Sequence, residues 1–206
     1  MAMIMAILGL LVGSGILMGQ TMIQGARTKD TMAMATDLSV AVRTFKDRYK
    51  YFPGDLPDAQ NKIPEVQNDC NYNRDNDANT PPVVGNGLID TKEVIANGLS
   101  EVECLPIHLS RAGLIRGSDP TQPSTPMRSR FGVVRILSRI DFATEPLAPN
   151  LPDHLRNVIV FEDLPVDVAQ EMDRNMDDGN TTTGQHRSSP ITNPSQGPVK
   201  FYVVPL

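Results

Sequence analysis

The chain has 206 residues, which is enough for one globular domain with some length left over. Its formal net charge is −5 and it has no long run of Lys and Arg, so it lacks the basic footprint of a phosphate-binding surface, and we expect no specific nucleic-acid partner. Hydrophobic residues make up 40% of the chain but are unevenly spread, because the first 26 residues carry no charged side chain.

The segment Met1–Gly19, MAMIMAILGLLVGSGILMG, is apolar apart from Ser14. As a helix it would span roughly 28 Å, close to the thickness of a bilayer core, so we expect a membrane anchor. A cleaved signal peptide is the alternative, but a basic region and an A-x-A cleavage site are missing. Its glycines have small-xxx-small spacing, which favours close packing of helices.

After Arg27 the sequence becomes charged, but apolar side chains recur at alternating spacings of four and three residues. This pattern predicts one buried face on a helix that continues from the anchor and ends at Pro53 and Gly54. We therefore divide the chain into a membrane half (1–25), an amphipathic half of the same helix (26–52) and a globular head (53–206). The residues expected to pack the helix on the head are Leu38, Val42, Phe45 and Tyr49.

The N-terminal stretch MAMIMAILGLLVGSGILMGQ closely resembles the helix of type IV pilins and type II secretion pseudopilins. In that family the helix follows Gly-Phe-Thr-Leu-Ile-Glu, which this sequence lacks together with the leader. A start assigned too late is the favoured explanation, and the alternatives are that these residues are omitted here or that this copy cannot be processed. Further similar segments are AVRTFKDRYKYFPGDLPDA (41–59), GNGLID (85–90), HLSRAGLIRG (108–117) and MDRNMDDGNTTTG (172–184).

This resemblance implies a structural subunit of a type IV pilus or pilus-like filament, with a pilin-like fold and no enzymatic activity. Its expected partners are the inner membrane before assembly, the pilus assembly machinery and copies of itself in a helical homo-oligomer. The filament would be periplasmic or extracellular, in a Gram-negative-type bacterium. The alternatives are a minor pilin or pseudopilin of a secretion or DNA-uptake apparatus, and a monomeric membrane-anchored binding protein. The expected assembly residues are Ile4, Ile7, Leu8, Leu11, Ile16 and Leu17.

The remaining sequence predicts a small α+β head with long loops, the first of them Leu56–Leu88. Asp90 and Glu93 have the spacing of a capping box, which predicts a helix running from there towards Gly113, although Pro106 allows a later start. β-Branched runs predict strands at Val133–Ile140, Val158–Phe161 and Val199–Val204, and a further helix is expected at Pro165–Met176.

Cys70 and Cys104 belong to no CxxC motif and have no nearby histidine at metal-ligand spacing. In an oxidising compartment they would form a disulfide that closes a loop of about 35 residues, worth about 3–4 kcal/mol. The alternative is two separate thiols in a cytosolic protein. Because the N-terminal segment argues for export, we expect the disulfide.

Two acidic segments were considered as calcium sites. Asp75, Asp77 and Asn79 begin like a calcium loop, but Thr80 and Asn86 replace the glycine and the glutamate of an EF-hand, so a solvated acidic loop is the preferred interpretation. A second run near the C-terminus raises the same question, although a helix end followed by a Gly-Asn turn also explains it. Its members are Asp173, Asp177, Asp178 and Asn180. We therefore expect no obligatory cofactor.

Catalytic motifs are missing from the sequence. The three histidines, His108, His154 and His186, lie in separate segments and form no ligand pair. The chain contains no G-x-S-x-G, H-E-x-x-H or Walker A motif. The sequence therefore favours a structural rather than an enzymatic role.

Overall fold

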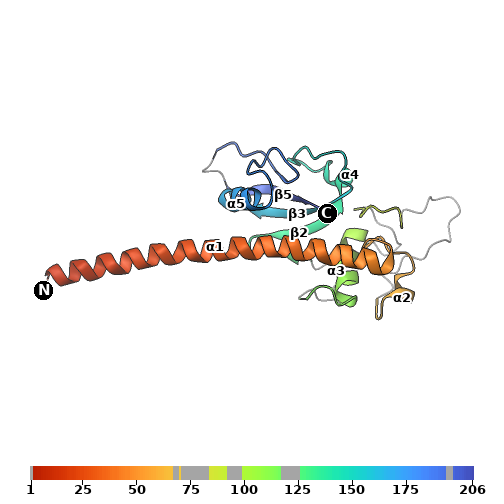
Figure 1. The fold of residues 1–206 in the computed structure, drawn as a ribbon, viewed down its shortest axis with the longest axis horizontal. Coiled ribbons are helices and arrows are strands. Elements are labelled where there is room, and N and C mark those ends of the chain that lie inside the picture. Colours follow the sequence, from red (N-terminus) through yellow and green to blue (C-terminus); the bar gives the residue numbers. More distant parts are fainter. Residues whose placement is uncertain (1, 67–69, 71–83, 92–98, 117–125, 194–196) are drawn as a thin grey trace.

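The computed structural model describes residues 2–66, 70, 84–91, 99–116, 126–193 and 197–206, with side chains described from Met22 onward. It has the α+β fold expected from the sequence: one very long N-terminal helix and a head built on an antiparallel sheet. In Figure 1 the C-terminal half of the long helix runs along the head, while its N-terminal half extends well beyond it.

The long helix, α1, spans Ala2–Tyr49 and is roughly 72 Å long at 1.5 Å per residue. Its buried face consists of Thr28, Thr31, Ala35, Leu38, Ala41, Val42 and Phe45. The helix ends three residues before the predicted boundary, because Lys50 takes a left-handed conformation with φ of 67°. The end is therefore set by the backbone at Lys50, before Pro53 is reached.

The head sheet has five antiparallel strands in the order β1-β2-β3-β5-β4. Its central strands are β2 (Val133–Ser138), β3 (Asn157–Leu164) and β5 (Val199–Pro205), with Ile136 opposite Ile159 and Ile159 opposite Val204. The outer strands are two residues long, β1 (Met127–Arg128) and β4 (Arg187–Ser188). Short outer strands limit the edge that remains open to further pairing.

Both faces of the sheet are buried. Successive side chains of a strand point to opposite faces, so neighbouring residues of one strand belong to different cores. Ile159 and Phe161 of β3 pack in the larger core with the buried face of α1 and with α5 (Val166–Met176). Val158 and Val160 point the other way, into a smaller core with Phe142. Phe142 belongs to α4 (Arg139–Phe142), which follows β2 directly.

The helix that precedes the sheet, α3, spans Glu101–Arg111 and corrects the predicted start at Asp90. Its capping box is formed by Ser100 and Glu103: the Ser100 Oγ accepts the Glu103 N–H, and the Glu103 carboxylate accepts the Ser100 N–H. Pro106 lies inside the helix, so it does not mark the start either. Glu93 of the predicted box lies outside the described residues.

Sequence patterns missed four short elements: α2 (Ala59–Lys62), β1, α4 and β4. The strand predicted to end at Ile140 stops at Ser138, whose Oγ accepts the Asp141 N–H and so caps α4. The predicted helix at 165–176 and the last strand agree with α5 and β5 to within a residue.

Candidate functional site

Helix α1 presents a surface that the head does not cover. Met22, Ile23 and Val40 are 73%, 57% and 57% exposed. The expected assembly residues, Ile4, Ile7, Leu8, Leu11, Ile16 and Leu17, belong to the same helix, but their side chains lie outside the described part. Among the residues whose side chains are described, no helix has the length and apolar character needed to cross a membrane.

The opposite face of α1 is fixed to the head. Leu38, Val42 and Phe45 are buried in the larger core, and Tyr49 is half-buried against it. The Phe45 ring lies 4.5 Å from the Tyr49 ring and stacks on His108 of α3 at 6.1 Å, measured between ring centres. Nearer the N-terminus, the Gln24 side chain donates a hydrogen bond to Asp167 of α5. The head therefore holds the C-terminal half of α1 along most of its length.

Close to the contact between Phe45 and His108, a disulfide joins Cys70 to Cys104 of α3, with the two Cα atoms 5.4 Å apart. His108 lies beside it: its Nδ1 accepts the Gly54 N–H at 2.9 Å, so Nε2 carries the proton and donates to the Cys70 carbonyl at 2.9 Å. Burial lowers the pKa of His108 to about 4, which keeps the ring neutral. This histidine links the end of α1, the disulfide and α3.

The Pro-Gly-Asp turn after α1 and the Gly-Asn-Gly segment at 85–87 form a single structural unit. Asp55 is fully buried, and its carboxylate accepts the N–H groups of Gly85, of Asn86 at 3.2 Å and of Gly87 at 2.8 Å. Gly54 is required here, because its φ is 89° and a Cβ atom would lie 2.3 Å from the Glu101 carbonyl oxygen. Both sequence segments therefore serve to close this turn.

Next to this turn, Glu101 is fully buried, and only one of its two carboxylate oxygens accepts a hydrogen bond from a described residue. Its Oε2 accepts the Asp90 N–H at 2.8 Å, whereas its Oε1 has no hydrogen-bond partner among the described residues. Burial raises the pKa of Glu101 to about 9, and the nearby charge of Asp55 acts in the same direction. Burial also raises the pKa of Asp55, to about 6. The interior of the head near the end of α1 thus holds a carboxyl group that is protonated at neutral pH.

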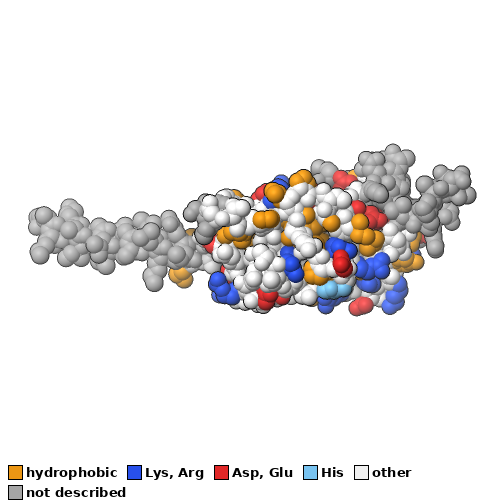
Figure 2. Space-filling view, turned by 90° about the horizontal axis from the view of Figure 1, so that it is seen from above, with side chains coloured by type: hydrophobic (Ala, Val, Ile, Leu, Met, Phe, Trp, Pro, Cys, Tyr) orange, Lys and Arg blue, Asp and Glu red, His pale blue; other side chains and the backbone are white. Residues whose placement is uncertain are grey.

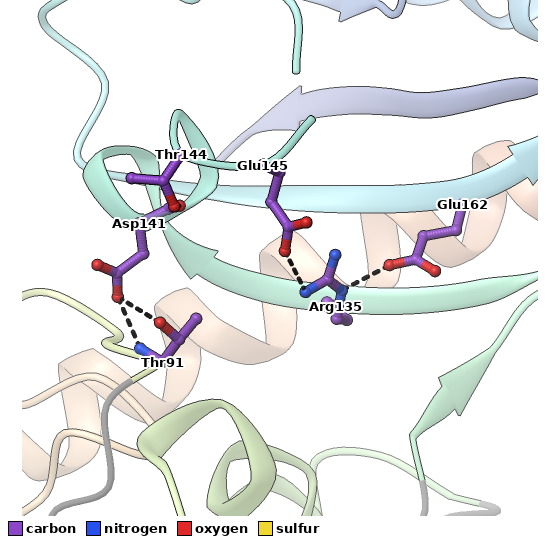
Figure 3. A network of polar contacts seen from close by, with 6 residues as sticks. All are labelled: Thr91, Arg135, Asp141, Thr144, Glu145 and Glu162. Atoms are coloured by element: carbon purple, nitrogen blue, oxygen red, sulfur yellow. Dashed lines mark hydrogen bonds and ion pairs between the residues drawn. The ribbon is translucent and has the colours of Figure 1, made fainter. Parts of the chain in front are cut away.

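The polar network drawn in Figure 3 lies on the neighbouring part of the sheet. Arg135 of β2 contacts Glu162 of β3 at 2.6 Å and Glu145, after α4, at 3.2 Å. Asp141 accepts hydrogen bonds from the N–H of Thr91 at 2.7 Å and from its hydroxyl at 3.0 Å. Arg135 therefore joins the segment after α4 to the sheet, and Asp141 joins the loop at Thr91 to α4.

A third group of acidic residues lies at the C-terminal end of α5. Asp173, Asp177 and Asp178 can each place one carboxylate oxygen within 4.8 Å of the other two. Asp177 accepts the N–H groups of Gln185 at 2.6 Å and His186 at 2.8 Å, and Asp178 accepts the Thr183 hydroxyl at 2.6 Å. The loop after α5 thus folds back onto the helix end and holds two of the carboxylates in place.

Asp173 differs from the other two carboxylates. It has no solvent-exposed area, and neither of its oxygens meets the distance and angle of a hydrogen bond with any described residue. Burial raises the pKa of Asp173 to about 6, the charges of Asp177 and Asp178 act in the same direction, and the nearby backbone amides of Gly179 and Asn180 lower it in part. The sequence showed this acidic run, but it could not show that one member is buried.

Asp75, Asp77 and Asn79 all lie outside the described residues. Of the acidic segments weighed from the sequence, only the group at the end of α5 is brought together by described residues.

Comparisons with protein-family models, with curated proteins and with solved structures find no match to this chain.

Proposed function

We propose that the chain is a structural subunit of a type IV pilus or a related filament, with a pilin-like fold and a structural rather than catalytic role. The observation that carries this proposal is α1, a 48-residue helix held by the head along its C-terminal half only. Its N-terminal half extends past the head in Figure 1. The sequence of that half is uncharged up to Ala26.

An uncharged helix of this length is costly to leave in water, since each buried Leu or Ile side chain is worth about 1.5–3 kcal/mol relative to exposure. A lipid bilayer before assembly and the helices of neighbouring subunits after it would both cover the extended half. Such a subunit would be drawn from the inner membrane and stacked with its head outward. The residues proposed to make the contacts between helices are Ile4, Ile7, Leu8, Leu11, Ile16 and Leu17.

The proposal is tested by Leu11→Glu, introduced into the chromosomal gene so that the chain is made in its natural context. The matched control is Leu147→Glu, because Leu147 is a head residue with 64% of its surface exposed. Filaments sheared from cells are quantified by immunoblotting and electron microscopy. We expect Leu11→Glu to abolish filaments and Leu147→Glu to retain them. Normal filaments with Leu11→Glu would reject the proposal.

The same preparations decide whether the chain is a major or a minor subunit. A major subunit would be present in every repeat of the filament, whereas a minor pilin or pseudopilin would be present in a few copies per filament. Quantitative mass spectrometry of purified filaments gives this ratio. A chain that is absent from all filaments would favour the membrane-anchored binding protein.

A further inference from the structure

The geometry points to a divalent-cation site at the C-terminal end of α5, where Asp173, Asp177 and Asp178 would bind Ca²⁺ through carboxylate oxygens. This inference concerns the head alone and does not depend on filament assembly.

The spacing of the three carboxylates suits one shared ion. Ca²⁺ binds oxygen ligands at about 2.3–2.6 Å, so two ligands of the same ion lie at most about 5 Å apart. One oxygen from each aspartate falls within 4.8 Å of the other two. Three oxygens from three separate side chains can therefore reach a common ion with little rearrangement.

The second observation is the unpartnered Asp173 side chain. Asp173 has no exposed area, and within the described part of the chain neither of its oxygens has a partner at hydrogen-bond geometry. Burying a polar group without a partner destabilises the folded state, and burying an unpaired charge destabilises it more. None of the ion pairs formed by the described residues includes Asp173, Asp177 or Asp178. A bound cation would supply both the missing partner and the missing positive charge.

The position on the helix adds a third argument. The C-terminal end of a helix carries a partial negative charge, which disfavours acidic side chains and favours cations. Asp173 and Asp177 lie at this end of α5, and the Asp177 N–H donates to the Asp173 carbonyl at 2.8 Å. The three carboxylates and the helix end all present negative charge to the same place. A positive ion there would be favoured by each of them.

The loop that follows α5 holds the site in shape and favours calcium over magnesium. Gly184 has a φ of 70°, and a Cβ atom there would lie 2.0 Å from an Asp177 carboxylate oxygen, so only glycine allows the loop to close on that side chain. A loop that holds several carboxylate oxygens together suits Ca²⁺, which accepts six to eight ligands in irregular geometry. Mg²⁺ requires a near-ideal octahedron at about 2.0–2.1 Å and releases its water reluctantly.

The test uses the full chain in detergent, freed of metal with a chelator and titrated with CaCl₂ or MgCl₂ alone. Isothermal titration calorimetry gives the stoichiometry and affinity, and thermal unfolding gives the change in Tm. We expect one Ca²⁺ per chain, a higher Tm with Ca²⁺ and at least about tenfold weaker binding of Mg²⁺. The main variant is Asp173→Asn, and the matched control is Asp47→Asn, which makes the same chemical change at an exposed position of α1.

Asp173→Asn and a second variant, Asp177→Asn, should each weaken Ca²⁺ binding by at least about tenfold, whereas Asp47→Asn should bind as the wild type does. The inference is overturned if wild-type protein binds no Ca²⁺, or if both site variants bind it with wild-type affinity. The titration of wild-type protein decides the question even where a variant fails to fold. Because none of these measurements involves filaments, a negative result leaves the proposed function standing, and loss of filaments in Leu11→Glu leaves the cation site untouched.

Discussion

Glu101 and His108, two ionisable side chains of α3, lie fully buried near the end of α1, and they make the stability of the head depend on pH in opposite directions. Burial raises the pKa of Glu101 and lowers that of His108, so in the folded state both are held in their uncharged forms. Their effects partly cancel between about pH 4.5 and 6.5, so variants are needed to separate them.

Glu101→Gln should stabilise the head most at alkaline pH. The folded carboxyl has a pKa of about 9 against its ordinary value of 4.5, so the folded state keeps a proton that the unfolded state releases, and stability falls as pH rises through this range. Removing the group should raise the free energy of unfolding by about 1–3 kcal/mol at pH 8, with a smaller gain at pH 5. Urea unfolding at several pH values measures this difference.

The control is Glu65→Gln, since the Glu65 side chain is 77% exposed and makes a surface ion pair with Arg111. It should change stability by less than about 1 kcal/mol at every pH. A gain for Glu101→Gln that is the same at pH 5 and pH 8 would contradict the titration argument.

For His108 we expect the stability of the head to change with pH in the opposite direction, and at acid pH. Its folded pKa is about 4 against 6.5, so the unfolded state takes up a proton that the folded state does not, and stability falls as pH drops from 6.5 towards 4. The loss is about 3 kcal/mol over the full window. His108→Gln should remove this part of the acid sensitivity in urea unfolding, whereas the same change at the exposed His154 should retain it. Equal acid sensitivity in both variants would refute the assignment.

At the level of the elements, the disulfide is expected to be a main source of stability for the loop-rich side of the head. It joins residues 34 apart in sequence, which in the chain-entropy model is worth about 4 kcal/mol. Reductant should therefore lower the urea midpoint of the wild-type protein. The double variant Cys70→Ser, Cys104→Ser should start at the lower midpoint and show no response to reductant. If reductant lowers both midpoints equally, the effect does not come from this bond.

The sequence predicted the long elements well and the short ones poorly. The C-terminal half of α1 follows a helical apolar period, and β3 and β5 contain runs of β-branched apolar residues, so each gives a signal over several consecutive residues. The start of α3 was misplaced because Asp90 and Glu93 have the same spacing as Ser100 and Glu103, and only the structure shows which pair caps a helix. Two-residue strands such as β1 and β4 leave no period to detect.

For the sites, pairing of the two cysteines could be expected from composition and context alone. The sequence could not single out the group at the end of α5 as a cation site, because nothing in it distinguishes Asp173 from other polar residues near a helix end. What sets Asp173 apart is that it is buried without a hydrogen-bond partner among the described residues, and this depends on how the loop at 177–186 folds back. Asp55 was likewise visible only as part of a turn motif, and not as the acceptor for amides some thirty residues later.

At the scale of the whole molecule, the head surface in Figure 2 mixes hydrophobic side chains with charges of both signs. The exposed side chains of α1, in contrast, lie on the element proposed to contact neighbouring subunits. Val40 is 57% exposed there, so Val40→Glu should change the stability of the chain by less than about 0.5 kcal/mol. In a filament it would place a charge against the adjacent subunit, so filament yield should fall.

The matched control for this prediction is Ile140→Glu, because Ile140 is 60% exposed and belongs to α4, away from α1. Filament yield is measured by shearing, and stability by urea unfolding. Equal yields for the two variants would place Val40 outside the contacts between subunits.

The clasp that Asp55 forms with Gly85, Asn86 and Gly87 has a consequence for how the chain tolerates change. The disulfide fixes Cys70, and the clasp fixes the backbone from Gly85 onward. The stretch 71–83 therefore runs between two anchored points, and doubling its length would cost only about 0.6 kcal/mol in closure entropy. We therefore expect an epitope or label inserted between Cys70 and Gly85 to leave the disulfide and the Asp55 clasp intact.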